Sequence, residues 1–216
     1  MTRSSSVKTA TRKDQSSSQN ALEILKRDHQ AVKKLFASYA RLADGQDAED
    51  SQKEELAGQI CNALTVHAGL EEEIFYPALR EALEDQAILD EAEVEHETAK
   101  VLIVQIRQMS ASDDLFDAKV TVLGEYIDHH VAEEEGVMFE QAREADIDLE
   151  ALGSAMEARR GALEEEVEAG ADQDQDQGED EDDDEDEDEE DDEDEEKEEE
   201  QDTGDENVAD DRRRRA

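Results

Sequence analysis

The sequence predicts an all-α protein: an up-down-up-down antiparallel four-helix bundle with a short fifth C-terminal helix and disordered ends. Three observations support this fold class. Apolar residues recur at three- and four-residue steps through the middle of the chain, which is the spacing of one helical face. The chain has one proline and few glycines, and it lacks the alternation of β-branched residues that is typical of strands. Short connections between long amphipathic segments favour antiparallel neighbours.

The first predicted helix covers residues 20–42, with Ser18 as a candidate N-cap and Asp44-Gly45 as a stop signal. Its inward residues are Leu22, Leu25, His29, Val32 and Phe36. The second covers residues 51–84, and Pro77, which lacks an amide hydrogen, is expected to kink or break it near Phe75. The inward residues of this second helix are Leu56, Ile60, Ala63, Leu64, His67, Leu70, Glu71 and Ile74.

The third predicted helix covers residues 87–109, and the fourth begins near Ser112-Asp113-Asp114 and runs to residue 144. The inward residues of the third are Leu89, His96, Ala99, Ile103 and Ile106. Those of the fourth are Phe116, Val120, Leu123, Tyr126, Ile127, His130, Glu134, Val137 and Met138. A shorter fifth helix over residues 149–167, with Leu152, Met156 and Leu163, is expected to pack outside the bundle or to project from it.

The distribution of charge predicts one folded domain between two disordered ends. Residues 1–18 form a basic leader of about +3, whereas residues 163–216 carry about −28 of the net charge of −45. From Ala169 the chain is almost entirely acidic or Gln, so it cannot offset its ordering entropy by burial. We therefore expect a leader over 1–18, the bundle over 19–168, and an acidic tail over 169–216 that ends in the arginine cluster Arg212–Arg215.

Composition also restricts the compartment and the partners expected for the protein. A single cysteine, Cys61, excludes an intrachain disulfide and is expected to be a small buried residue in a reducing compartment. No secretory signal or membrane span is predicted, so the expected location is the cytoplasm. The net charge of −45 repels phosphates, so no nucleic-acid partner is expected. The acidic tail is expected mainly to aid solubility, and recruitment of basic proteins is the alternative.

Two copies of one motif indicate a metal site. His67-x-x-x-Glu71 and His130-x-x-x-Glu134 each place a nitrogen and an oxygen donor on the same side of a helix. The inward faces of the first and third helices each add one histidine, His29 and His96. The six donors are thus expected to meet at one depth in the bundle and to hold two ions, because burying them without a cation would leave costly unpaired polar groups.

The donor types restrict the metal. Imidazole nitrogen with carboxylate oxygen suits iron, manganese or zinc better than copper(I) or calcium. Two carboxylates from opposed helices can bridge two such ions. A ferritin-like arrangement would need two Glu-x-x-His motifs, and Glu93-x-x-His96 is the only match, so that class is disfavoured.

Residues 20–165 resemble the hemerythrin-like family, the HHE cation-binding domains. The matching segments are Ile24–His29 with Leu35-Phe36, His67-x-x-x-Glu71-Glu72 before Phe75-Tyr76-Pro77, Glu95-His96, and His129-His130-Val131-x-Glu133-Glu134-Glu135 with Phe139. The resemblance implies a four-helix bundle around a non-haem di-iron centre that binds oxygen or related small ligands. It assigns His29, His67, His96 and His130 as terminal ligands and Glu71 and Glu134 as bridges.

Two positions depart from the family pattern. Oxygen-carrying hemerythrins have a second histidine four residues after the third-helix ligand, where this chain has Lys100. That coordination position is open, filled by solvent, or taken by a side chain such as Glu93 or Glu97. The fourth helix also has two adjacent histidines. We favour His130 as the ligand because it aligns this motif with His67 and Glu71, which leaves His129 pointing outward or supporting the ligands.

The expected function is that of a di-iron protein, with iron favoured over manganese or zinc, that binds or reacts with oxygen, peroxide or nitric oxide. Sensing, detoxification or storage would follow from such binding. A peroxide-decomposing, catalase-like enzyme is one alternative, and a metal-stabilised platform whose tail recruits basic proteins is another. Tyr126, one turn before His130, is expected either to support the ligands or to belong to the bundle core.

Overall fold

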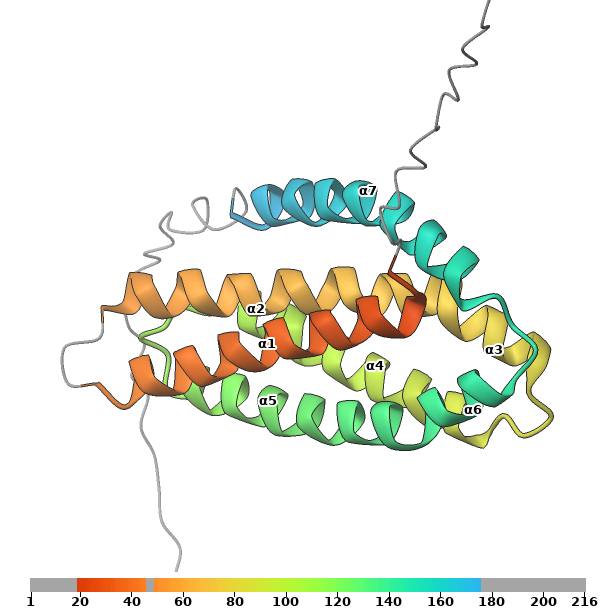
Figure 1. Cartoon of the computed structure of the whole chain (residues 1–216). Helices are drawn as coiled ribbons and strands as arrows, with labels where there is room; N and C mark the ends of the chain where they lie inside the picture. Colours follow the sequence, from red (N-terminus) through yellow and green to blue (C-terminus); the bar gives the residue numbers. More distant parts are fainter. Residues whose placement is uncertain (1–18, 46–48, 176–216) are drawn as a thin grey trace, which may run out of the picture. The chain divides into compact units, whose positions relative to one another are not determined.

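The computed structural model describes residues 19–45 and 49–175, and within these ranges all regular structure is helical. The elements are α1 (Ala21–Ala43), α2 (Asp50–Leu70), η1 (Glu71–Phe75), α3 (Tyr76–Ala82), α4 (Ala87–Arg107), α5 (Phe116–Glu133), η2 (Glu134–Met138), α6 (Phe139–Glu144) and α7 (Leu149–Gln175). The π-helical turns η1 and η2 join α2 to α3 and α5 to α6 without a break. Four long helical rods therefore lie antiparallel to their chain neighbours, as predicted (Figure 1).

The start of α1 is fixed by Asn20 and not by the predicted Ser18. The Asn20 side chain accepts a hydrogen bond from the Glu23 backbone N–H at 3.0 Å, and the Glu23 carboxylate accepts one from the Asn20 N–H at 3.1 Å. This reciprocal capping box satisfies two backbone donors that a helix start leaves free. The helix ends at the predicted stop signal, where Asp44 is the C-cap.

The two π-helical turns change which residues face inward. Each turn adds one residue to the helix, so the inward face after Glu71 and Glu134 moves forward by one position. Phe75 and Tyr76 are fully buried in place of the predicted Ile74, which is only partly buried. Likewise Met138 and Phe139 are buried, whereas Val137 is 47% exposed, so its predicted inward position was wrong. Helical structure continues through Pro77, the second residue of α3, so Pro77 does not break the helix near Phe75.

Two apolar clusters enclose a buried polar layer. Along every rod, one cluster lies on one side of the buried histidines and the second lies on the other side. The first contains residues such as Leu25, Leu70, Phe75, Tyr76, Leu89, Met138 and Phe139. The second contains Val32, Ile60, Cys61, Leu64, Ile103, Phe116 and Leu123, which confirms the predicted burial of Cys61. The polar layer is therefore held between two blocks of tightly packed side chains.

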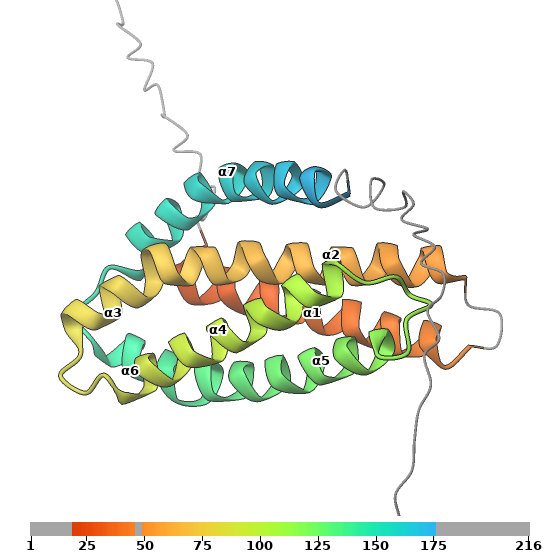
Figure 2. The ribbon, with the colours of Figure 1, turned by 180° about the vertical axis from the view of Figure 1, so that it is seen from behind.

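The fifth helix, α7, is longer than predicted and packs along α1 and α2 (Figure 2). Met156, Leu163 and Val167 are buried against the bundle. The helical backbone extends to Gln175, so disorder from Ala169 onward was wrong for residues 169–175. Residues 169–175 contain two alanines and two glutamines, which are good helix formers and can continue the helix that precedes them. The predicted disordered leader over 1–18 and the rest of the predicted tail, residues 176–216, lie outside the described residues.

Replacing Gly153 with alanine is expected to loosen α7. A Cβ atom at this position would overlap the backbone carbonyl oxygen of Gln19, next to the start of α1. Backbone cannot move aside as a flexible side chain can, so we expect the free energy of unfolding to fall by about 1–3 kcal/mol. Urea unfolding measures this change.

Gly161 provides the matched control on the same helix. A Cβ there meets nothing within 4 Å, so Gly161→Ala should be neutral or stabilise by about 0.4–1 kcal/mol. Equal stabilities for the two variants would contradict the close approach of α7 to α1.

In the part of the chain that the structure describes, no helix combines the length and the apolar character needed to cross a bilayer.

Candidate metal centre

The six residues predicted as ligands converge in the polar layer of the bundle. They come from four rods, and each is at most 6% exposed: His29 (α1), His67 (α2), Glu71 (η1), His96 (α4), His130 (α5) and Glu134 (η2). Their donor atoms form two overlapping groups. One contains His29, His67, Glu71 and Glu134, and the other contains Glu71, His96 and His130. The structure thus brings together the six side chains, and their role as ligands stays a prediction.

Glu71 lies between the two groups. Its Oε1 is 3.2 Å from His67 Nε2, and its Oε2 is 3.4 Å from His96 Nε2. One carboxylate therefore faces a histidine of each group with a different oxygen. This is the arrangement that a carboxylate bridge between two ions requires.

Glu134 connects the remaining two histidines. Its Oε2 is 3.2 Å from His29 Nε2 and 3.5 Å from His130 Nε2. Its Oε1 accepts a hydrogen bond from the Tyr76 hydroxyl at 2.9 Å. Tyr76 thereby fixes the orientation of this carboxylate.

Tyr76 was missed by the sequence analysis, which considered Tyr126 for a supporting role. Tyr126 is only partly buried, and it makes no side-chain hydrogen bond with the six residues in the described ranges. Tyr76 enters the site because η1 rotates it inward. The sequence signal for it was its place one π-helical turn after the predicted ligand Glu71. Its hydroxyl also lies 3.3 Å from His96 Nε2.

A second layer of carboxylates orients the histidines. Nδ1 of His29 is 2.9 Å from Glu135, that of His96 is 2.8 Å from Glu72, and that of His130 is 2.7 Å from Glu95. Nδ1 of His67 faces Asp28 at 3.8 Å, which is beyond hydrogen-bond distance. Each acid adjoins an inner residue in sequence but contacts the histidine of a neighbouring rod. A hydrogen on Nδ1 that is donated to a carboxylate leaves Nε2 free to bind a metal inside the bundle.

The geometry of the inner atoms fits cations. Nε2 of His29 lies 3.1 Å from Nε2 of His67, and Nε2 of His96 lies 3.2 Å from Nε2 of His130. Two such lone pairs repel each other unless a positive charge lies between them. Both oxygens of Glu71 and Oε2 of Glu134 are buried without a hydrogen-bond partner, which is costly for a charged group. Metal ions would satisfy all of these atoms at once.

The pKa values show the same demand for positive charge. Burial alone would lower the pKa of His29, but contact with Glu134 and the charges of Glu134 and Glu71 raise it to about 9. Burial would also lower the pKa of His96, but its contacts with Glu71 and Glu72 outweigh this effect and raise the pKa to about 10. The pKa of Glu134 is lowered to about 2 because His29 and His130 outweigh its burial. Protons therefore take the place of metal in the metal-free chain, and metal binding must displace them.

The metal-free protein should lose stability as the pH rises above neutral. The pKa values of His29 and His96 are raised above the ordinary 6.5. Their contribution to the free energy of unfolding is therefore complete below pH 6.5 and lost as the pH rises through about 9 to 10. Thermal unfolding of the metal-free chain between pH 6.5 and 10 measures this loss. The metal-loaded chain is the control, and a metal-free Tm that falls no more steeply than the control would contradict the assignment.

No carboxylate takes the coordination position that Lys100 leaves one turn after His96. Lys100 Nζ pairs with Glu72 Oε2 at 2.5 Å, outside the ring of histidines. Glu93 is exposed and pairs with Arg80 at 2.8 Å, and Glu97 is exposed. Neither Glu93 nor Glu97 therefore takes the position as suggested from the sequence. Of the two adjacent histidines, His130 is buried and the His129 side chain is 62% exposed, as predicted.

Comparisons with known proteins agree with this geometry. The family model for the hemerythrin HHE cation binding domain matches residues 20–142, more than half of the chain. A solved structure of a hemerythrin HHE cation binding domain-containing protein from Mycobacterium kansasii is similar, with a TM-score of 0.57 and 22% identity. The match covers 68% of this chain and 89% of that one. At this identity the likeness shows the fold alone.

A curated relative extends the comparison. A DNA nickase from Nostoc sp. is 33% identical over 125 residues, which are 57% of this chain and 34% of the nickase. The chain thus spans about a third of that relative, and the nicking activity is a property of a much longer protein.

Proposed function

Since this chain belongs to the hemerythrin HHE cation binding domain family, we propose that it holds two iron ions and binds a small oxidising ligand such as oxygen, peroxide or nitric oxide. The observation that carries this proposal is the set of three buried carboxylate oxygens without partners, facing four imidazole nitrogens. His29, His67, His96 and His130 would be the terminal ligands, and Glu71 and Glu134 the bridges. Manganese and zinc suit the same donors, and family membership favours iron.

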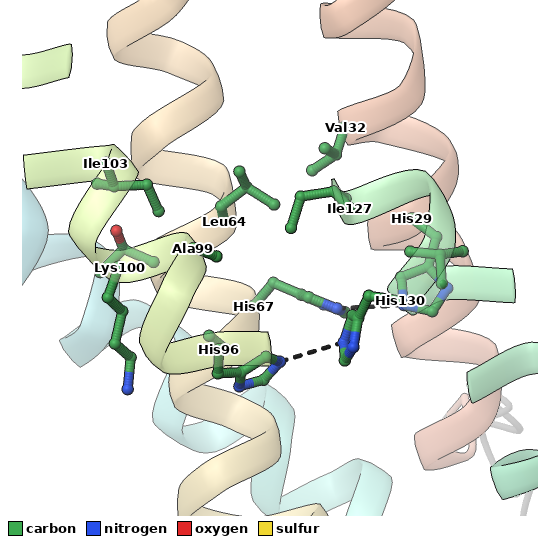
Figure 3. A pocket seen from close by; sticks show the side chains of 13 residues that line it. His29, Val32, Leu64, His67, His96, Ala99, Lys100, Ile103, Ile127 and His130 are labelled. Atoms are coloured by element: carbon green, nitrogen blue, oxygen red, sulfur yellow. Dashed lines mark hydrogen bonds between the residues drawn. The ribbon is translucent and has the colours of Figure 1, made fainter. Parts of the chain in front are cut away.

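An apolar cavity beside the histidines supports a ligand of two or three atoms. The cavity has a volume of about 40 Å³, and on this measure a water molecule needs roughly 10–15 Å³. Figure 3 shows the four imidazoles next to apolar side chains of all four rods, and the residues that line the cavity include Val32, Leu64, Ala99, Ile103 and Ile127. Such a lining favours small, weakly polar molecules and disfavours bulk water. A larger organic substrate would not fit.

When bound, the iron pair supplies one-electron chemistry and an attachment point for the ligand. The chain supplies the rest. Three carboxylates outside the ring of histidines hold an imidazole each in one tautomer: Glu135 holds His29, Glu72 holds His96 and Glu95 holds His130. Tyr76 holds Glu134 through its hydroxyl. The apolar lining keeps the ligand away from water and from the exposed acids.

Metal analysis together with visible spectra tests the proposal. The purified full chain should contain about two irons per molecule, and its spectrum should change on exposure to air, peroxide or nitric oxide. Iron-loaded protein that responds to none of the three would refute the proposed ligand class. Protein that takes up no iron would refute the centre itself.

A variant pair tests the cavity. Ala99 is buried and lines the cavity, so Ala99→Leu should fill it and slow ligand binding at least about tenfold, with the iron content unchanged. Ala92→Leu adds the same volume in the other apolar cluster and is the control. Equal ligand-binding rates in the two variants would show that the small ligand neither binds in this cavity nor passes through it.

Peroxide disproportionation is the second candidate function, and Tyr76 is the observation that favours it. Burial, together with the charges of Glu71 and Glu134, raises the pKa of Tyr76 well above its ordinary value. The hydroxyl therefore stays protonated beside the centre, where it can donate its hydrogen bond to Glu134 or to a peroxide bound there. Oxygen release from peroxide that falls severalfold in Tyr76→Phe, at unchanged iron content, would support the enzyme. No oxygen release from the wild type would exclude it.

We propose no nucleic-acid partner for this chain, because its net charge of −45 opposes the approach of phosphates. A platform function of the acidic tail concerns residues outside the described ranges. Deleting residues 176–216 should leave the iron centre intact, and loss of captured basic proteins on that deletion would favour the platform.

A further inference from the structure

The four outer carboxylates are not alike on their solvent side. Three of them have a basic partner: Asp28 pairs with Arg160 at 2.6 Å, Glu72 with Lys100 at 2.5 Å, and Glu135 with Lys26 at 3.7 Å. Glu95 is the exception. Within residues 19–45 and 49–175 no lysine or arginine pairs with it.

Glu95 instead faces a histidine and a second carboxylate. His129 Nε2 is 3.7 Å from Glu95 Oε1 and 3.6 Å from Glu133 Oε1. His129 and Glu133 are four residues apart on α5, so they project from one face of the helix. One donor atom from each of the three residues lies within 4.8 Å of the other two.

These separations are too long for hydrogen bonds but suit donors that share one ion. Zinc binds imidazole nitrogen and carboxylate oxygen at roughly 2.0–2.2 Å, so two of its tetrahedral ligands lie about 3.4 Å apart. The separations of 3.6 and 3.7 Å need only a small inward movement. The His129 side chain is 62% exposed, so it can make this movement and water can complete the coordination.

Glu95 is prepared for such a role. Its side chain is only 9% exposed, and its Oε2 accepts the hydrogen bond from His130 Nδ1 at 2.7 Å. That bond aims Oε1 outward at His129. A carboxylate that is buried and held in one rotamer binds a cation without a further loss of side-chain entropy.

We propose that Glu95, His129 and Glu133 form a separate surface site for one divalent cation of the zinc type. The cation takes the place that Arg160, Lys100 and Lys26 have behind the other three acids. A divalent ion balances the charges of the two carboxylates, Glu95 and Glu133. Because Glu95 also holds His130, the site is joined to the inner centre by one side chain. The site requires only these three residues, so it stands whether or not the inner centre reacts with oxygen.

Zinc titration of the iron-loaded full chain by calorimetry, in about 0.15 M salt to screen the many exposed acids, tests the proposal. We expect one tight zinc ion per chain in the wild type. His129→Ala and Glu133→Gln should each weaken its binding at least tenfold. Glu144→Gln, which removes the same charge from an exposed position of α6, should leave it unchanged.

The iron content after the titration separates the surface site from the centre. It should be the same in the wild type and in all three variants. Zinc uptake that equals the iron lost would place the zinc in the centre and overturn the proposal. Zinc affinity that is equal in the wild type and His129→Ala would overturn it as well, because binding would then come from carboxylates elsewhere.

Discussion

Replacing His130 with alanine is expected to abolish stable iron binding at the centre. His130 Nε2 lies 3.5 Å from Glu134 Oε2 and 3.2 Å from His96 Nε2, and the side chain is 3% exposed. Loss of a residue that merely supports a ligand costs about 10–100-fold in metal affinity, so loss of a ligand should cost at least that much. Iron analysis of the purified variant, together with its visible spectrum, measures the effect.

His129→Ala is the matched control for this experiment. It removes the adjacent imidazole, whose side chain is 62% exposed and faces Glu95 and Glu133. Its iron content should match the wild type, even though its surface zinc site is lost. The opposite result, in which His129→Ala loses iron and His130→Ala keeps it, would show that the ligand of the fourth helix is His129.

Removing the metal should lower the Tm of the protein by about 10 °C. Glu71 is fully buried and Glu134 is 1% exposed, so without cations two carboxylates remain in the interior of the bundle. An ion present at about 1,000 times its Kd stabilises a protein by roughly 4 kcal/mol. For a chain of this size each kcal/mol shifts the Tm by about 2–4 °C.

Thermal unfolding of the chelator-treated and the iron-restored chain at pH 7 measures this shift. His130→Ala is the control, because a chain that holds no iron should not respond to the chelator. A shift below about 2 °C in the wild type would mean that the protons on His29 and His96 compensate the buried carboxylates nearly as well as iron does.

The sequence predicted the fold and the meeting of six side chains because both depend on helical periodicity. The spacing of His67 to Glu71 and of His130 to Glu134 survives in the structure, and α1 and α4 each bring their histidine to the same depth. Periodicity failed where the helix itself departs from 3.6 residues per turn. The turns at η1 and η2 moved Tyr76 inward and Val137 outward, and no local pattern marks such a turn.

The outer carboxylates could not be predicted for a different reason. In a chain of which 41% of the residues are charged, Glu72, Glu95 and Glu135 look like ordinary surface acids. Their role depends on which histidine of a neighbouring rod they contact, and that is decided by packing between helices. The length of α7 was underestimated because the acidic composition beyond Val167 was taken as a sign of disorder, although the alanines and glutamines among residues 169–175 favour helix.

The ion pair between Arg160 and Asp28, at 2.6 Å, makes α7 part of the environment of His67 although this helix supplies no donor. The family model ends at residue 142 and so excludes α7. A fragment trimmed to that boundary would retain all six inner residues but uncover the apolar flank of α1 and α2 and strip Asp28 of its counter-charge. The smallest piece of this chain that keeps its metal affinity should therefore extend through α7, beyond the boundary of the matched domain.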